Sequence, residues 1–456
     1  MNRRDLFKSA ALAGSATGAL AQQARGAAND RIGIGVIGCG GMGRMDLADF
    51  QKQPEAEIVA VCDVYQPNLQ EAHQLTDGKA RTYSDFRKLL EDRAVDAVVI
   101  ATPDHWHPLI TVAACQAGKD VYCEKPVSNV VREGRLMVEA ARRHRRIVQV
   151  GLQQRSGSHF QRAAKIVRSG EIGEVHYAQT WIHETSSPEG LGTPPDSEPP
   201  AGLDYDFWLG PAPKVPFNAA RFLGNWRSFS AYGGGRITDW GVHLVDIVHM
   251  AMGVDTPRAV TASGGKLYVH DRRDTPDTQE VTWEYPGFLL HYTCLLHNSY
   301  GHNGDAGHKP FGSYGIQFHG TRGTLFVDRA GYQITPQMKG HMEPGGISFR
   351  AAFDDLTGVS LYYDLEGTGG RGTSSVQHVP HVRNFLQCVK SRERPVADIE
   401  IGHRTTTACH LGNIALRLEQ KLHWDGEAER FVGNEAANRM LVRPYRAPWK
   451  LEGIEA

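Results

Sequence analysis

The sequence lacks several features that would define common protein classes. None of its seven cysteines forms a C-x-x-C pair, and their spacing predicts neither a zinc-binding motif of that kind nor a disulfide framework. No apolar run is long enough to cross a bilayer, so we expect no stable membrane span. Lys and Arg total 50 against 51 Asp and Glu, and this lack of basic excess argues against a nucleic-acid partner. The 456 residues then suggest a globular protein of two or three domains.

The N-terminus has a pattern of its own. Paired arginines at Arg3 and Arg4 precede a weakly apolar run from Ser9 to Ala21, which ends in a small-residue cleavage pattern. This order resembles a twin-arginine export signal, although Leu6 and Phe7 stand in swapped order relative to the usual pattern. We interpret residues 1–28 as a signal peptide and expect a periplasmic or otherwise exported protein that folds before export. The alternative is a disordered basic tail.

A glycine turn follows the first buried segment, residues 32–37. Gly38, Gly40 and Gly43 have the G-x-G-x-x-G spacing of a dinucleotide-binding turn. In that interpretation Gly38 makes the turn, Gly40 lets the pyrophosphate approach the backbone, and Gly43 lets a helix pack closely. Asp63 ends a second strand-like segment 20 residues after Gly43, where a carboxylate binds the ribose hydroxyls of NAD. No cation follows it closely to neutralise a 2′-phosphate, which favours NAD over NADP.

Strand-like and helix-like segments alternate from residue 31 to residue 152. This spacing predicts a doubly wound parallel sheet, that is, a Rossmann domain. Two strand ends in it carry polar side chains: Thr102 to His107 after one strand, and Glu124-Lys125-Pro126 after the next. Ligands bind at the carboxyl ends of such strands. His105 and His107 could instead only shape the loop, and a metal site at this His-x-His pair is a weaker alternative.

These motifs together resemble the glucose–fructose oxidoreductase, inositol dehydrogenase and MocA family. The resemblance covers about residues 31–425 and implies that Lys125 is a catalytic or substrate-orienting residue beside the nicotinamide. It also implies that the bond between Lys125 and Pro126 is often cis. The predicted cofactor contacts are Gly38, Gly40, Gly41, Met42, Gly43, Asp63, Thr102, Pro103, His105, His107, Glu124 and Lys125.

Residues 153–378 are predicted to form an α+β domain for substrate binding and oligomerisation. Runs of strand-like segments without interleaved helices predict a large, mainly antiparallel open sheet. The resemblance implies that the outer face of this sheet forms a dimer or tetramer interface. Residues 186–216 form a long loop with aromatic residues, which we interpret as a lid or a sugar-stacking wall. The predicted substrate contacts are Lys125, Arg155, Trp181, Trp208, Asp239 and His243.

Asp239 and His243 are four residues apart in a helix-like segment that follows three glycines. They would share one helical face, where the carboxylate could orient the imidazole and raise its basicity. A buried histidine satisfied by a neighbouring aspartate, or a metal pair, would give the same spacing. The pattern resembles the second catalytic motif of the family, which implies that His243 is the general base. The resemblance also implies that residues 379–425 form helices that pack back on the first domain, and residues 426–456 would form a tail.

We therefore expect an NAD-dependent oxidoreductase that acts on a sugar, glycoside or polyol hydroxyl, with no metal. His243 would take the hydroxyl proton, Lys125 would stabilise the developing alkoxide, and Asp239 would fix the tautomer of His243. Because free dinucleotide is scarce outside the cytoplasm, an exported enzyme would hold its NAD tightly. An NAD-dependent glycosidase that oxidises its sugar transiently, or a non-catalytic sugar sensor, are the alternatives.

Overall fold

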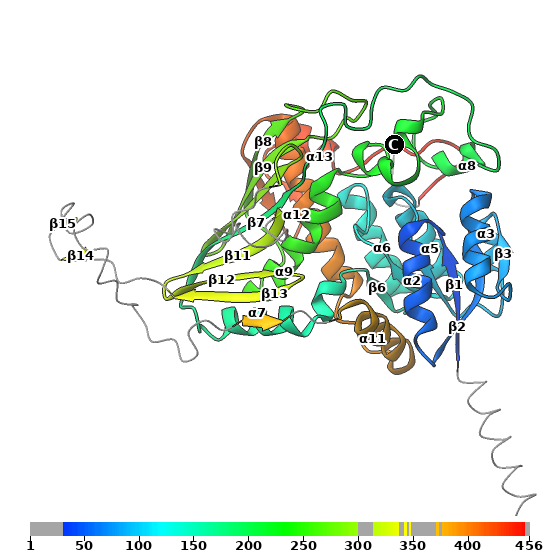
Figure 1. Cartoon of the computed structure of the whole chain (residues 1–456), viewed down its shortest axis with the longest axis horizontal. Helices are drawn as coiled ribbons and strands as arrows, with labels where there is room; N and C mark the ends of the chain where they lie inside the picture. The colour runs from blue at the N-terminus through cyan, green and yellow to red at the C-terminus, as the bar shows by residue number, and fades with distance from the viewer. Residues whose placement is uncertain are drawn as a thin grey trace, which may run out of the picture.

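The computed structural model describes residues 31–299, 313–336, 342–343, 346–347, 371–373 and 376–451. The predicted signal peptide, residues 1–28, lies outside this set and its export function stays a prediction. Figure 1 shows two sheets side by side, each with helices packed on it. The first domain is coloured blue to cyan, and the larger sheet belongs to the second domain.

The first domain contains the predicted parallel sheet. Its six strands have the order β3-β2-β1-β4-β5-β6, and every neighbouring pair is parallel. The central strands are entirely buried and apolar, as expected for a sheet covered on both faces. The strands are β1 (Ile32–Ile37), β2 (Ala56–Cys62), β3 (Arg81–Tyr83), β4 (Ala97–Ile100), β5 (Asp120–Cys123) and β6 (Val148–Val150). The helices are α2 (Gly41–Gln51), α3 (Gln66–Leu75), α4 (Phe86–Leu90), α5 (His107–Gln116) and α6 (Val131–Arg143).

The second domain is built on the predicted mainly antiparallel sheet. Its strand order is β16-β13-β12-β11-β7-β10-β9-β8-β17-β18, and only the pairing of β7 with β10 is parallel. Helices α7 (Ser158–Arg168) and α9 (Val242–Met252) pack against each other, and α9 also contacts β7. The longer strands are β7 (Val175–His183), β8 (Ala259–Gly265), β9 (Thr278–Tyr285), β10 (Phe288–Leu295), β11 (Tyr314–Gly320), β12 (Gly323–Asp328) and β13 (Gly331–Pro336). The shorter ones are β16 (Arg371–Thr373), β17 (Leu422–Asp425) and β18 (Arg430–Phe431).

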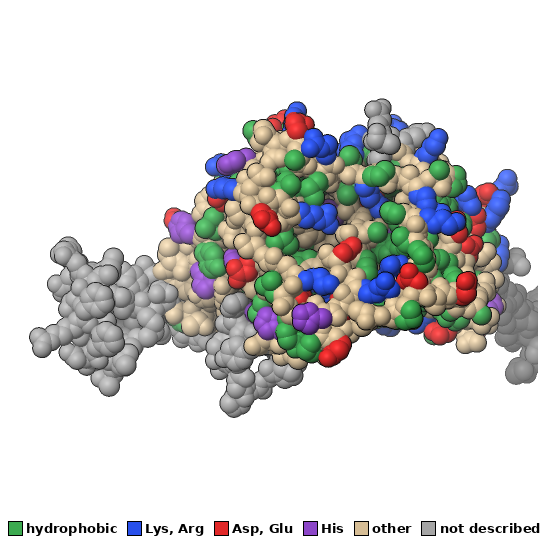
Figure 2. Space-filling model, turned by 90° about the horizontal axis from the view of Figure 1, so that it is seen from above, with side chains coloured by type: hydrophobic (Ala, Val, Ile, Leu, Met, Phe, Trp, Pro, Cys, Tyr) green, Lys and Arg blue, Asp and Glu red, His purple; other side chains and the backbone are tan. Residues whose placement is uncertain are grey.

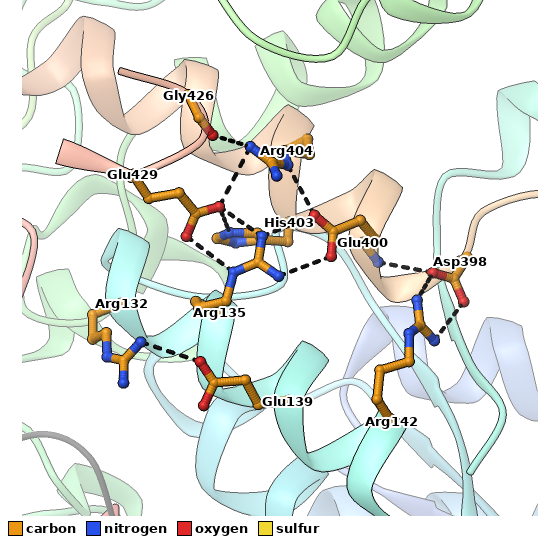
Figure 3. A network of polar contacts seen from close by, with 10 residues as sticks. All are labelled: Arg132, Arg135, Glu139, Arg142, Asp398, Glu400, His403, Arg404, Gly426 and Glu429. Atoms are coloured by element: carbon orange, nitrogen blue, oxygen red, sulfur yellow. Dashed lines mark hydrogen bonds and ion pairs between the residues drawn. The ribbon is translucent and has the colours of Figure 1, made fainter. Parts of the chain in front are cut away.

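Two C-terminal helices connect the domains. Helix α11 (His378–Ser391) packs on α2, and α12 (Ile399–Leu418) lies between α6 of the first domain and β8 of the second. Arg135 of α6 pairs with Glu400 at 2.8 Å and with Glu429 at 2.6 Å, and Glu429 also contacts His403 (Figure 3). This network holds α6, α12 and the following segment together and anchors α12 on α6 of the first domain.

Two further segments cover the carboxyl end of the first sheet. Residues 186–232, here called the lid, include α8 (Tyr205–Leu209) and return to the first domain, where the backbone nitrogen of Asp204 donates to the carbonyl of Val64 at 3.0 Å. Residues 443–449, here called the C-terminal strap, cross over the lid: Arg446 donates to the Gly210 carbonyl at 2.9 Å. The strap also binds α6, because Arg443 pairs with buried Glu133 at 2.6 Å.

Surface and core agree with an ordinary globular chain. All seven cysteines are buried and free. On the face that carries the lid, Lys and Arg side chains lie interspersed with acidic and hydrophobic ones (Figure 2). None of the helices in the described ranges is long and apolar enough to cross a membrane.

Candidate active site

The glycine turn joins β1 to α2 at the carboxyl end of the first sheet. Gly38 has a φ of +88°, which favours glycine, and a Cβ on Gly43 would lie 1.9 Å from the Gly38 carbonyl oxygen. A Cβ on Gly40 or Gly41 would meet no protein atom within 4 Å. Gly38 and Gly43 are therefore required by the fold, whereas Gly40 and Gly41 leave open space beside the uncapped N-terminus of α2. This is the arrangement that a pyrophosphate needs.

Asp63 follows β2 and faces the same turn. Its carboxylate accepts hydrogen bonds from the backbone nitrogens of Cys39 at 2.7 Å and Tyr65 at 2.8 Å. Burial raises the pKa of Asp63, and these backbone hydrogen bonds partly offset the effect. Arg44 of α2 lies near enough to lower this pKa further, but it donates to the Cys39 carbonyl at 2.7 Å and pairs with Glu71 at 3.1 Å. A carboxylate held by backbone nitrogens, beside an arginine that is already paired, fits an adenosine ribose at Asp63.

A cavity of about 460 Å³ extends from the glycine turn and Asp63 to the inner end of the lid. The first domain contributes Thr102 and Pro103, and the lid contributes Trp208, Phe222 and Arg227. The lid thus forms the opposite wall of the cavity. Its aromatic residues pack on the first domain: Phe222 meets Tyr65 edge to face, with ring centroids 5.3 Å apart.

Lys125 and Asp239 meet where the two domains come together. The Lys125 ammonium donates to the Asp239 carboxylate at 2.8 Å and to its carbonyl at 2.7 Å. The same carboxylate oxygen accepts from Arg227 at 3.1 Å, and the other accepts from Arg236 at 3.0 Å. Because Arg227 also lines the cavity, the Lys125–Asp239 pair lies directly behind the cavity wall. The bond between Lys125 and Pro126 is cis, as the family resemblance implied.

The charge on Asp239 is set by its neighbours. Burial alone would raise the pKa of Asp239, but Lys125, Arg227 and Arg236 hold it far below its usual value. The carboxylate is therefore ionised at any physiological pH. Asp239 lies in a π-helical turn (Ile237–Gly241) that leads into α9, and the structure shows no hydrogen bond from it to His243. The expectation that Asp239 fixes the tautomer of His243 is thus not supported: it positions Lys125 instead.

His243 lies on the first turn of α9, next to this pair. Burial holds the pKa of His243 well below the usual histidine value, and the charges of Lys125 and Arg329 lower it further. Its Nδ1 atom is buried and has no hydrogen-bond partner in the described part of the chain. The imidazole is therefore neutral at pH 7, and one of its two ring nitrogens can accept a proton.

Several predicted cofactor contacts serve the structure around the cavity. Both ring nitrogens of His107 are engaged, with the Pro126 carbonyl at 2.7 Å and the Thr102 carbonyl at 2.9 Å. His105 is fully buried and bonds to the Trp208 carbonyl at 3.3 Å. Neither lines the cavity. Glu124 is buried, and burial raises its pKa to about 7, although Lys125 partly offsets the rise. The histidines thus hold loops and lid in place.

The predicted substrate contacts separate in the same way. Trp181 has no exposed surface and stacks on Phe326, so it belongs to the core of the second sheet and does not reach the cavity. Arg155 is held by Asp246 at 2.8 Å beneath α9 and is likewise a structural pair. Trp208 does line the cavity, but it lies in the wall that the lid contributes on the dinucleotide side. Alternation of residue types in a strand could not tell which face each aromatic side chain takes.

The sequence interpretation did not identify three arginines that lie near Lys125, Asp239 and His243; this group of residues is here called the reaction centre. Arg227 and Arg236 flank Asp239, as described above, and Arg329 follows β12. The Arg329 guanidinium lies over the ring of Trp240, 4.7 Å from its centroid. Arg227 and Arg236 are near Asp239 in sequence and could have been proposed from that spacing. Arg329 stands far along the chain with no motif around it, so nothing in the sequence marked it.

Comparison with known proteins follows the same division of the chain. Residues 32–152 match a model described as an oxidoreductase family with an NAD-binding Rossmann fold, and residues 179–271 and 372–451 match the C-terminal alpha/beta domain of that family. Together the two models cover more than half of the chain. The chain belongs to this family, the GFO/IDH/MocA oxidoreductases.

Individual relatives are more distant. The chain is 32% identical over 178 residues to the uncharacterized oxidoreductase YrbE of Bacillus subtilis. This match covers 38% of this chain and 47% of that one. It is 30% identical over 167 residues to the inositol 2-dehydrogenase of Salmonella typhimurium, covering 35% and 48%. The chain spans about half the length of the curated relatives it matches.

Solved structures match over a larger share. A levoglucosan dehydrogenase in complex with NADH and levoglucosan has a TM-score of 0.63 at 16% identity and covers 86% of this chain and 99% of that one. The WlbA dehydrogenase of Bordetella pertussis, solved with NADH and UDP-GlcNAcA, has a TM-score of 0.62 at 19% identity, with 87% and 99% covered. At these identities the matches show a shared fold.

Proposed function

We propose that the protein is an NAD-dependent dehydrogenase that oxidises a hydroxyl group of a sugar or polyol. The observation that carries the proposal is the Lys125–Asp239 pair with the neutral His243 beside it, behind the wall that Arg227 forms in a cavity of about 460 Å³. Related chains are named inositol 2-dehydrogenases, and fold neighbours are named sugar dehydrogenases. These names support the choice of a polyhydroxylated substrate.

The residues of the cavity fit a dinucleotide. The open space at Gly40 and Gly41, the uncapped first turn of α2 and the carboxylate of Asp63 would hold the pyrophosphate and the adenosine ribose. Among the described residues, Arg44 is the cation that acts on Asp63, and its pairing with Glu71 leaves less charge for a 2′-phosphate, which favours NAD. The lid and its aromatic side chains cover the cavity, which supports slow exchange of the cofactor.

A bound nicotinamide supplies the hydride acceptor. The chain's own residues would handle the proton and the charge. His243 accepts the hydroxyl proton of the substrate, because its imidazole is neutral at pH 7 and has one unprotonated ring nitrogen. Lys125 keeps a third N–H for the same substrate oxygen and stabilises the negative charge that develops on it. Asp239 fixes the ammonium through its carboxylate and its carbonyl, and the lid covers the neighbouring cavity.

The test measures NADH formation on a panel of hexoses, their acids and inositols. His243→Ala should lower kcat by about 10²- to 10⁴-fold while NAD affinity, measured by fluorescence titration, stays the same. In the wild type, kcat/KM should rise with pH and reach its plateau below the usual histidine pKa of about 6.5, since burial lowers the pKa of His243. His144→Ala, a substitution on the far side of the first domain, is the matched control.

The competing outcomes are distinct. Release of the aglycone from aryl glycosides without net NADH formation would indicate the glycosidase alternative. Bound NAD(H) in the purified protein with no turnover of any compound would indicate a sensor. Full activity of His243→Ala would remove the proposed base.

A further inference from the structure

Four cations surround the reaction centre, and three of them have carboxylate partners. Lys125 and Arg227 contact Asp239, and Arg236 contacts both Asp239 and Glu184, the latter at 2.6 Å. The fourth cation, Arg329, has no ion pair within the described ranges. Its Nε donates to the side-chain oxygen of Gln154 at 3.2 Å, in the amide orientation that also lets Gln154 donate to the His243 carbonyl.

Arg329 nevertheless lies close to the reacting groups. Its guanidinium covers the face of Trp240, and the Trp240 ring centroid is 6.4 Å from that of His243. Its charge acts on His243, and burial lowers the pKa of Arg329 itself. Gln154 engages Nε, so the two terminal nitrogens keep their donors for another group.

The local charge balance is therefore positive, although the whole chain has a formal net charge of -1. Four cations face two carboxylates, Asp239 and Glu184. Two further acids lie nearby with reduced negative charge: burial raises the pKa of Asp104 well above its usual value, and it raises that of Glu124 to about 7, which leaves Glu124 about half ionised at neutral pH. Glu124 and Asp239 act on Arg329 from a distance, but no carboxylate in the described ranges contacts it, and a partly buried cation without such a partner costs free energy unless a ligand supplies one.

We propose that the substrate is an anionic sugar, and that Arg329 binds its carboxylate or phosphate group. This inference rests on the proposed function, because it names the substrate class of the same site. A guanidinium with two free terminal nitrogens matches two oxygens of such a group in a bidentate pair. The anion would bind beside Trp240 and leave a neighbouring hydroxyl within reach of His243 and Lys125.

The experiment compares matched substrates on the NAD-loaded protein. D-glucose, D-galactose and D-mannose are each paired with their uronates and with their 6-phosphates, and kcat/KM is measured for wild type and Arg329→Gln. Wild type should prefer one anionic series by about 10- to 100-fold, the value of one or two charge-assisted hydrogen bonds. Arg329→Gln should remove this preference, because it lowers kcat/KM for the anionic series much more than for the neutral sugars. A preference for uronates or for 6-phosphates identifies the anion.

Two controls separate this effect from a general loss of structure. Arg162→Gln removes a surface arginine of α7 that pairs with Glu171 and should leave the preference intact. Arg329→Lys keeps the charge without the bidentate fork and should keep an intermediate preference, which also serves if the glutamine variant unfolds. Equal or better turnover of the neutral sugars by wild type, or an equal loss on both series in Arg329→Gln, would overturn the inference.

Calorimetry distinguishes failure of the inference from failure of the proposed function. If no sugar is oxidised, the proposed function is wrong. Binding of the uronates and 6-phosphates to NAD-loaded wild type and Arg329→Gln then still tests the anion site. Binding of an anionic sugar that is lost in Arg329→Gln supports the anion site. Absence of such binding, or binding that Arg329→Gln leaves unchanged, contradicts it.

Discussion

The cofactor cavity and the neighbouring cluster around Lys125 hold their key carboxylates in opposite ways. Asp63, in the cavity, is fixed by two backbone nitrogens, and burial raises its pKa. Asp239, in the cluster, is fixed by three cationic side chains that hold its pKa far below the usual value. The first arrangement depends on the local path of the chain after two strands. The second depends on side chains brought together from both domains, so its loss affects stability and catalysis together.

The largest effect should come from Asp239→Asn. The amide would leave Lys125, Arg227 and Arg236 without their common counter-charge, and we expect the free energy of unfolding to fall by about 3–5 kcal/mol. Because the folded-state pKa is depressed, the contribution of Asp239 is fully present above about pH 4, the unfolded pKa, and is lost only as the pH falls through the lower, folded value. Urea unfolding at pH 7 measures this loss.

A second variant tests the cause. Adding Lys125→Met to Asp239→Asn removes one of the unpaired cations, so the double variant should be more stable than the sum of the single variants predicts. Strict additivity would show that Lys125 and Asp239 do not stabilise each other. Turnover should be lost in both, since Lys125 would no longer be positioned.

A smaller and more specific effect is expected at Asp63. Asp63→Asn should weaken NAD binding by about 10- to 100-fold, because the ribose loses charge-assisted hydrogen bonds. Stability should fall by about 1 kcal/mol only, since the amide can still accept one of the two backbone hydrogen bonds. Titration with NAD and with NADP gives the affinities, and Asp77→Asn on the surface is the control. An NADP affinity that falls in parallel with that of NAD would contradict the role of Asp63 in choosing between them.

This contrast explains how much of the site could be predicted from the sequence. Asp63 and the glycine turn lie at fixed distances along one chain segment, so their spacing alone indicated their place, and the alternating pattern predicted both sheets. Lys125 and His243 were reached through the family resemblance. Trp181 was misplaced because periodicity assigns alternate faces but does not say which face is covered. Arg329 depends on the pairing of β11, β12 and β7 in the second sheet, which no local pattern encodes.

The smallest effect should come from the C-terminal strap, which holds the lid over the cofactor cavity. Trp449 of the C-terminal strap meets Trp106 with ring centroids 4.8 Å apart and Phe207 of the lid at 5.3 Å, so it ties the lid to the first domain. Each aromatic pair of this kind contributes about 0.5–1.5 kcal/mol, and Trp449→Ala should therefore speed NAD dissociation by about 3- to 10-fold. Stopped-flow displacement of NADH measures the rate, with exposed Lys450→Ala as the control. If the lid is held by the backbone pairing of Tyr65 and Leu203 alone, the rate will not change, and the strap would then contribute to stability without governing access to the cofactor.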